Sequence, residues 1–214
     1  MLAGSNGRMI RAVLVSGIAA LSCLSGLPSG KAADDQGEFA LRGFGAHACA
    51  DARTRIEQEP EAAQNALAWL LGYMSAVNRV QADTFDISPI VGGGPMLELL
   101  LGLCADNPDA LVENVAFELL RTLSIARVPT SSPVVDVEYE GARVQLRQQT
   151  LQAMQAALIE LDHLSGAADG VYGPQTRLAI QAFQESQEIP ETGVPDPVTI
   201  LRLLVELPRR AGDG

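Results

Sequence analysis

A short internal repeat near the carboxyl end constrains the fold of this chain more than any other feature. Residues 170–176 (GVYGPQT) match residues 193–199 (GVPDPVT) with glycine, valine, proline and threonine in the same register. Each copy combines a glycine-containing turn, a cap residue at Gly173 or Asp196, and a proline at the first helical position, where its missing N–H costs nothing. Together with apolar spacing over about 146–163, the repeat predicts three helices around one small core. The residues expected in that core are Leu151, Met154, Leu158, Leu161, Ala179, Ile180, Phe183, Leu201, Leu204 and Val205.

The preceding part of the chain predicts a separate helical domain. Apolar residues at helical spacing indicate a helix over about 46–58, a second from Pro60, a third around Met96 to Cys104, and a fourth capped by Asn107-Pro108. This periodicity stops at 128, where prolines, serines and threonine cluster. We therefore predict an all-α fold, in which a linker joins two helical domains and its second part is either a short strand or extended chain. The expected divisions are a signal peptide at 1–32, a helical domain at 33–127, a linker at 128–142, a three-helix domain at 143–208 and a tail at 209–214.

The first 32 residues have the pattern of a secretory signal peptide. Two arginines precede an apolar run that ends near Leu27, and Gly30-Lys31-Ala32 offers the small residues that signal peptidase requires before Ala33. An uncleaved anchor and lipidation at Cys23 are the alternatives. The predicted location is thus the periplasm or the exterior, with the membrane involved only through this segment.

Net charge indicates which partners to exclude, and the cysteines indicate a disulfide. Removing two arginines and one lysine with the signal takes the formal charge from −11 to −14, so an acidic chain without a basic run is expected to avoid nucleic acid. Cys49 and Cys104 form an even pair in an oxidising compartment, and we predict a disulfide between them, with two buried free thiols as the alternative.

The repeat and its flanks resemble a known family. Asp169 to Thr176, then Ala179-Ile180, Phe183-Gln184, Thr192-Gly193-Val194 and Thr199, are similar to the peptidoglycan-binding domain that is appended to bacterial cell-wall hydrolases. The resemblance covers about residues 146–207 and implies a three-helix bundle that binds peptidoglycan. Met154-Gln155 stands where such domains usually have Leu-Gln, and methionine packs where leucine does.

One helix start within this segment is a candidate ligand site. Gly173, unlike Asp196, has no side chain to accept hydrogen bonds from the first N–H groups of its helix. We expect an anionic group of peptidoglycan, a stem-peptide carboxylate or a muramyl oxygen, to dock there. A purely structural role is the competing interpretation for Asp169 and Thr176, whose side chains can satisfy backbone donors. The predicted ligand-binding residues are Tyr172, Gln175, Thr176 and Arg177.

Residues 43–124 carry a second resemblance. Cys49, the Trp69 to Tyr73 segment, Cys104 and Asn107-Pro108 are similar to the superfamily of the periplasmic acid-stress chaperone HdeA and of the immunity proteins of secretion-system effectors. This implies a protein-binding role without chemistry. Trp69 and Tyr73 lie four residues apart on one helix face, which favours core packing over a ligand platform.

Catalytic signatures are sparse in this sequence. His47 and His163 belong to different predicted domains, so no metal site is expected, and no cofactor motif occurs. Glu185-Ser186 resembles a lytic transglycosylase dipeptide but lies within the predicted binding domain. We predict a non-catalytic envelope protein that binds peptidoglycan and presents its helical domain to a periplasmic protein. The alternative is a cell-wall hydrolase, using carboxylates, or its inhibitor or immunity protein.

Overall fold

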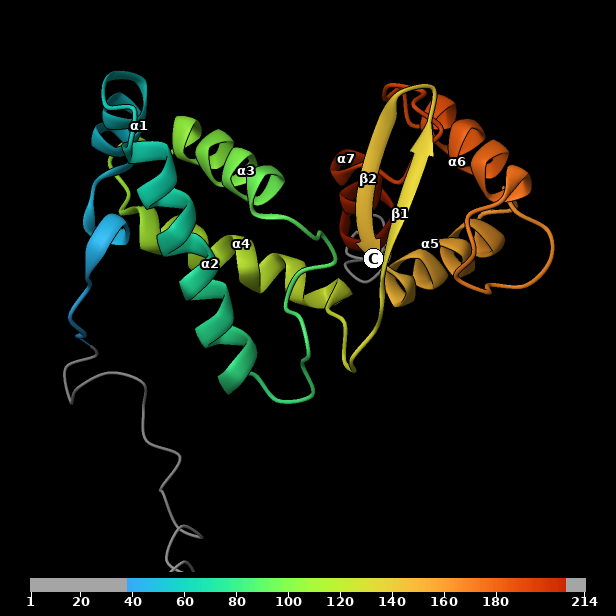
Figure 1. The fold of residues 1–214 in the computed structure, drawn as a ribbon, viewed down its shortest axis with the longest axis horizontal. Helices are drawn as coiled ribbons and strands as arrows, with labels where there is room; N and C mark the ends of the chain where they lie inside the picture. The colour runs from blue at the N-terminus through green and yellow to red at the C-terminus, as the bar shows by residue number, and fades with distance from the viewer. Residues whose placement is uncertain (1–37, 207–214) are drawn as a thin grey trace, which may run out of the picture. The chain divides into compact units, whose positions relative to one another are not determined.

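The computed structural model describes residues 38–206, which are mostly helical (Figure 1). The predicted signal peptide, its cleavage site and the tail at 209–214 lie outside the described residues. No helix in the described range has the length and apolar content needed to cross a membrane. Predominantly helical structure agrees with the expected class, whereas the division into domains stays a prediction.

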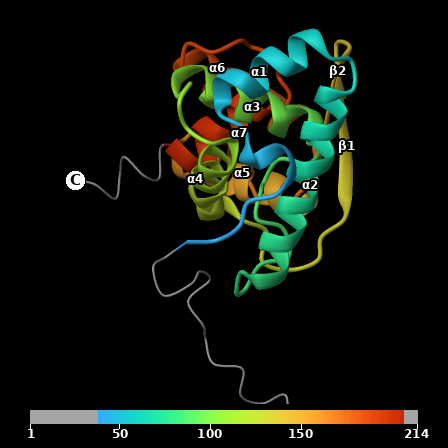
Figure 2. The same ribbon diagram turned by 90° about the vertical axis from the view of Figure 1, so that its left-hand side faces the viewer.

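Four α-helices make up the first part of the described chain. These are α1 (Cys49–Gln58), α2 (Ala62–Val80), α3 (Gly93–Asp106) and α4 (Val112–Leu123), with short 3-10 turns η1 (Gly43–Ala46) and η2 (Ser124–Ala126) before and after them. α3 packs against α1, α2 and α4 (Figures 1 and 2). Leu70, Leu100 and Leu123 are almost fully buried in the core between these helices, as their spacing predicts.

The start of α4 differs from the prediction. Asn107 and Pro108 do not cap this helix, which begins at Val112. They lie in a turn whose carbonyl groups serve another helix: Pro108 O accepts from Ala50 N–H at 2.9 Å, and Ala110 O accepts from Cys49 N–H at 2.8 Å. The first N–H groups of α1 would otherwise lack partners, so these tertiary hydrogen bonds override the local helix-start pattern.

The predicted disulfide between Cys49 and Cys104 is confirmed. The sulfur atoms are bonded, the two Cα atoms are 5.0 Å apart, and both residues are fully buried. The bond joins the first residue of α1 to the last turn of α3. It ties the helical part together across a separation of 55 residues.

A β-hairpin occupies most of the predicted linker, so the all-α class is wrong in this detail. β1 (Val134–Tyr139) pairs antiparallel with β2 (Ala142–Arg147), and Glu140 and Gly141, both with positive φ, form the two-residue turn. Apart from the exposed Val134, the apolar residues of both strands fall on one face, where Val137 and Leu146 are buried. Asp136 on the opposite face accepts from Arg143 and Gln145.

The last part of the described chain is the predicted helical bundle. It contains α5 (Gln148–Glu160), α6 (Pro174–Ser186) and α7 (Pro197–Leu201), which continues into a π-helical turn, η3 (Arg202–Glu206). Both repeat prolines occupy the first helical position, as predicted. Leu161 is the exception in the expected core: α5 ends at Glu160, which leaves Leu161 43% exposed. The fully buried side chains of the bundle include Leu151, Met154, Leu158, Ile180, Phe183 and Ile200.

Three contacts described here join the hairpin to the preceding helical part. Arg147 forms an ion pair with Asp86 at 3.0 Å, and Ile90 bridges Leu146 in antiparallel fashion. Arg147 also lies 4.7 Å above the ring of Phe85. The end of β2 is therefore anchored by the loop between α2 and α3.

Candidate functional site

Two buried glutamines hold the two repeat turns in the same way. Gln155 on α5 accepts from Gly170 N–H through Oε1 at 2.6 Å, while its Nε2 lies 3.0 Å from Val171 O and 3.1 Å from Thr176 Oγ1. Its Nε2 also lies 2.9 Å from a carboxylate oxygen of Asp169. The side-chain amide thus provides hydrogen-bond partners for the backbone N–H and C=O groups of the turn, which cannot pair with each other.

Gln184 on α6 repeats this arrangement for the second turn. Its Oε1 accepts from Gly193 N–H at 2.9 Å, and its Nε2 lies 3.2 Å from Val194 O and 2.8 Å from Thr199 Oγ1. Thr192 Oγ1 lies 2.9 Å from the same nitrogen. We call Gln155 and Gln184, with the turns that they hold, the glutamine clasps.

The second clasp is closed by a carboxylate. The hydroxyls of Thr192 and Thr199 donate to the two carboxylate oxygens of Asp196 at 2.7 and 2.9 Å, and both can accept from Gln184 Nε2. Asp196 also caps α7 by accepting from Thr199 N–H at 2.8 Å, as predicted. Every donor in this network therefore has an acceptor, which a buried polar cluster requires.

The structure gives the four predicted ligand-binding residues different surroundings. Thr176 is 5% exposed, and its hydroxyl lies within the first glutamine clasp, so its side chain has a structural partner. Gln175 is exposed in the first turn of α6. Tyr172 is half-buried and donates to Gly193 O at 2.6 Å. Arg177 donates to Gln181 Oε1 at 2.9 Å.

Tyr172 and Arg177 belong to one surface cluster that the hairpin completes. The guanidinium carbon of Arg177 lies 4.5 Å from the ring centre of Tyr139, the last residue of β1. These side chains surround Gly193, where an added Cβ would lie 3.2 Å from both Tyr139 and Gln181, so the cluster needs glycine at this point. We call Tyr139, Tyr172, Arg177 and Gln181 the tyrosine-arginine cluster.

Electrostatics within the cluster keep both phenols neutral. Burial raises the pKa of Tyr172, although the positive charge of Arg177 partly opposes this shift. A hydrogen bond with Glu140 raises the pKa of Tyr139. The cluster presents one cation between two neutral aromatic side chains, an arrangement that suits an anionic or hydroxyl-rich ligand.

Tyr139 and Gln181 are the members that sequence reasoning missed. Gln181 lies one helical turn after Arg177 on α6, whereas Tyr139 lies before the repeat and outside the predicted three-helix domain, so no motif indicated it. The alternation of Val135, Val137 and Tyr139, followed by Glu140-Gly141, is the pattern that could have predicted a hairpin with an aromatic residue beside its turn.

The adjacent helix start has the open geometry predicted for it. Gly173 is extended and offers no side chain to the first N–H groups of α6, whereas Arg177 N–H donates to Gly173 O at 2.9 Å within the helix. Gln175 and Thr176 also belong to this first turn, and Arg177 of the cluster follows them directly in the sequence.

The comparison with known families agrees with this part of the structure. Residues 147–203 match the model of the peptidoglycan binding domain family. No curated protein and no solved structure gives a significant match. The matched segment thus begins at Arg147 and contains α5, α6, α7 and both glutamine clasps. The resemblance of residues 43–124 to the HdeA superfamily receives no support from these comparisons and stays a prediction.

The helical part holds one buried carboxylate. Glu113, in the first turn of α4, is 6% exposed and accepts from Tyr73 Oη at 2.8 Å. Burial, followed by the contact with Glu113, strongly raises the pKa of Tyr73. Trp69 stacks on Tyr73 with ring centres 5.2 Å apart and donates through Nε1 to Arg42 O. These contacts are those of core packing.

Other chemistry-bearing residues are dispersed. Within residues 38–206, no three histidine, cysteine or acidic side chains are grouped as a metal site would require. His47 packs edge-on to Phe44, and His163 does the same with Phe183. Glu185 lies on an exposed face of α6, as expected for a solvated helix position.

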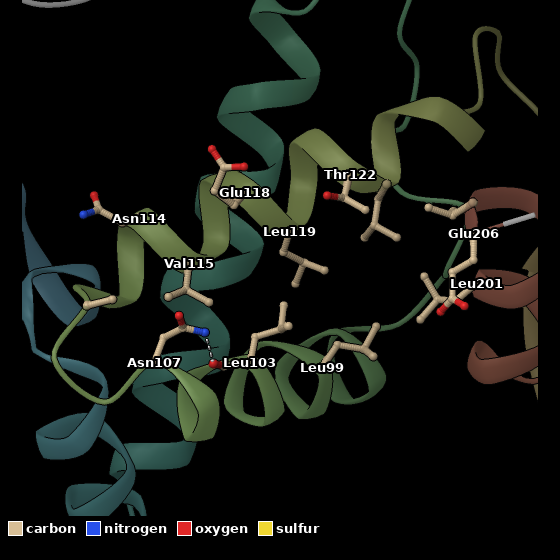
Figure 3. Close-up of a pocket in the computed structure, with 13 residues that line it drawn as sticks. Leu99, Leu103, Asn107, Asn114, Val115, Glu118, Leu119, Thr122, Leu201 and Glu206 are labelled. Carbon is tan, nitrogen blue, oxygen red and sulfur yellow. Dashed lines mark hydrogen bonds between the residues drawn. The ribbon is translucent and has the colours of Figure 1, made fainter. Parts of the chain in front are cut away.

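An apolar groove runs between α3 and α4. Leu99 and Leu103 project from α3 toward Val115 and Leu119 of α4, and Leu201 and Glu206 lie at one end (Figure 3). Its volume is about 460 Å³. Its lining is mainly aliphatic, and its two carboxylates, Glu118 and Glu206, are paired with Arg121 and Arg202.

Proposed function

We propose that this chain is a non-catalytic protein of the bacterial envelope that binds peptidoglycan through residues 147–203 and presents its helical part to a periplasmic protein. The match of residues 147–203 to the peptidoglycan binding domain family carries this proposal. The internal glutamine clasps support it because they maintain the turns from which the surface residues of the segment project.

Export follows from the same reasoning. A peptidoglycan-binding segment functions only where the wall is, and the confirmed Cys49–Cys104 disulfide is typical of an oxidising compartment. Both observations support delivery through the signal pattern of residues 1–32, to the periplasm or the exterior. A wall-bound helical part would meet its protein partner at a raised local concentration.

We assign the wall contact to the tyrosine-arginine cluster and the neighbouring start of α6. Arg177 supplies a guanidinium, and the open N–H groups near Gln175 supply the partial positive charge of a helix start. A stem-peptide carboxylate or a muramyl oxygen fits these donors. Tyr172 and Tyr139 supply aromatic surface beside them.

Co-sedimentation of the mature chain with purified sacculi tests this function. Arg177→Ala removes charge-assisted hydrogen bonds, so binding should weaken roughly tenfold, the equivalent of about 1.5 kcal/mol. Arg121→Ala is the matched control, because Arg121 is an exposed arginine that pairs with Glu118 on α4. Circular dichroism melting of each variant checks that the fold is retained.

Two results would contradict the proposal in different ways. Failure of the parent chain to sediment with sacculi removes peptidoglycan binding itself. Parental binding by both Arg177→Ala and Tyr172→Ala removes only the assigned contact. Clearing of sacculi by the mature chain in a zymogram would replace the non-catalytic assignment with a wall hydrolase.

A further inference from the structure

A second pocket lies between α5 and residues 126–129. Its volume is about 410 Å³, within the size range of small-molecule sites. Gln149 and Thr150 line it from the first turn of α5, and Ala153 and Ala156 line it one turn later. Ala168 and Pro129 complete its walls.

Unsatisfied polar atoms gather at this pocket. Among residues 38–206, three buried side-chain atoms lack a hydrogen-bond partner, and two of them, Gln149 Oε1 and Thr150 Oγ1, belong to neighbouring residues of its lining. Thr150 is 3% exposed. Leaving such an atom unpaired destabilises a folded protein, so two together indicate a place where a partner from outside is expected.

The other polar groups around the pocket are already engaged. Gln149 Nε2 donates to Thr130 Oγ1 at 2.7 Å, and Gln149 N–H donates to Ser132 Oγ at 3.0 Å. Gln152 Nε2 donates to Ala168 O at 2.8 Å. Arg127, at the rim of the pocket, donates to Asp83 O and Ser124 O. The buried side-chain atoms of the lining without a partner are one carbonyl-type acceptor and one hydroxyl, which can donate or accept.

This pair of groups complements a secondary amide. The N–H of such an amide can donate to Gln149 Oε1, and its carbonyl can accept from the Thr150 hydroxyl. The four alanines of the lining leave room for a small apolar group beside it, such as a methyl. Both atoms are buried, so binding of a ligand requires the half-buried Gln149 side chain to rotate and to give up its bond to Thr130.

We propose that this pocket binds a methyl-bearing secondary amide of peptidoglycan, a proposal that rests on the function proposed above. Two parts of peptidoglycan carry that group: the acetamido substituent of its amino sugars and the alanine of its stem peptide. The pocket includes residues 126–129, which precede the matched segment, so it adds a contact that the segment alone does not contain.

Calorimetric titration of the mature chain with two probes tests the pocket and identifies the source of the amide. One probe is an oligomer of N-acetylglucosamine, and the other is the stem tripeptide beginning with L-alanine. At least one should bind, and Thr150→Val should weaken that binding about fivefold because it removes one hydrogen bond. Thr150→Ser keeps the hydroxyl and should restore the affinity.

A stability measurement separates this role from a structural one. Because the Thr150 hydroxyl has no partner in the folded chain, Thr150→Val should leave the Tm unchanged or raise it, while affinity falls. Thr54→Val is the matched control, since Thr54 donates to Ala50 O on α1, far along the chain from the pocket, and should leave both titrations unchanged. Gln149→Met provides a second variant that removes the acceptor from a half-buried side chain.

The outcomes are distinct. Binding of neither probe by the parent, or parental affinity in both Thr150→Val and Gln149→Met, overturns the pocket assignment. Sedimentation of the parent with sacculi in either case leaves the proposed function standing. Loss of sedimentation by the parent would instead remove the function on which the pocket assignment rests.

Discussion

Replacing Gln184 with leucine should destabilise the bundle far more than its single amide suggests. The substitution keeps a side chain of similar size in a fully buried position, so little packing is lost. It removes the acceptor of Gly193 N–H and the donors to Val194 O and the threonine hydroxyls. Gly193 is buried, and Arg177, Gln181 and Tyr139 lie beside its Cα, which limits the access of water as a replacement.

The contacts of Gln184 set the magnitude. A buried N–H without a partner costs about 2 kcal/mol, and each of two lost donor bonds costs about 1 kcal/mol. The expected loss in the free energy of unfolding is therefore about 4 kcal/mol. In a folded unit of this size, that corresponds to a Tm lower by roughly 8–16 °C.

Urea unfolding followed by circular dichroism measures this loss. Gln187→Leu is the matched control, because Gln187 is half-buried at the end of α6 and its side chain contacts only Ser186 among the bonds described. It should change stability by no more than about 0.5 kcal/mol. A loss below about 1 kcal/mol for Gln184→Leu would refute the view that the clasp holds the second turn.

Two other predictions concern covalent and ionic stabilisation. Replacing Cys49 and Cys104 with serine should lower the free energy of unfolding by about 4 kcal/mol, because the closed loop restricts the unfolded chain, and equal urea midpoints with and without the bond would contradict this. Two aspartates have lowered pKa values. Hydrogen bonds from Val171 N–H and then Gln155 lower the pKa of Asp169, and hydrogen bonds from Gln145 and then Arg143 lower that of Asp136. The two charged carboxylates contribute to the free energy of unfolding above the ordinary aspartate pKa of about 4, and this contribution is lost as pH falls through their lowered pKa values in the folded chain. Asp169→Asn should therefore make the Tm depend less on pH in acid.

Local rules predicted most of the bundle and little of its polar interior. Proline at the first helical position and a cap at Asp196 act within one turn, so the starts of α6 and α7 could be predicted from spacing. That Thr176 faces Gln155 depends on how α5 packs on the turn, which no local pattern contains. The predicted ligand role of the Thr176 side chain competes with this structural bond.

The remaining differences arise from contacts between distant parts of the chain. Asn107-Pro108 has the sequence of a helix start, but its turn provides carbonyl groups to α1 instead. The hairpin lies where composition predicted a linker, because its short apolar alternation gains stability only when Val137 and Leu146 are buried against neighbouring elements. Tyr139 lies in the candidate site for the same reason, since its contact with Arg177 joins parts of the chain that are distant in sequence.

The choice of glutamine at positions 155 and 184 has a consequence for how the two turns respond to acid. An amide side chain neither gains nor loses a proton between mildly acidic and mildly alkaline pH. Its hydrogen bonds to the backbone of Gly170 and Gly193 are thus independent of pH, whereas Asp169, whose pKa the bond from Val171 N–H lowers, loses its charge in strong acid. The two turns can keep their shape in conditions that would weaken a domain fastened by charged pairs.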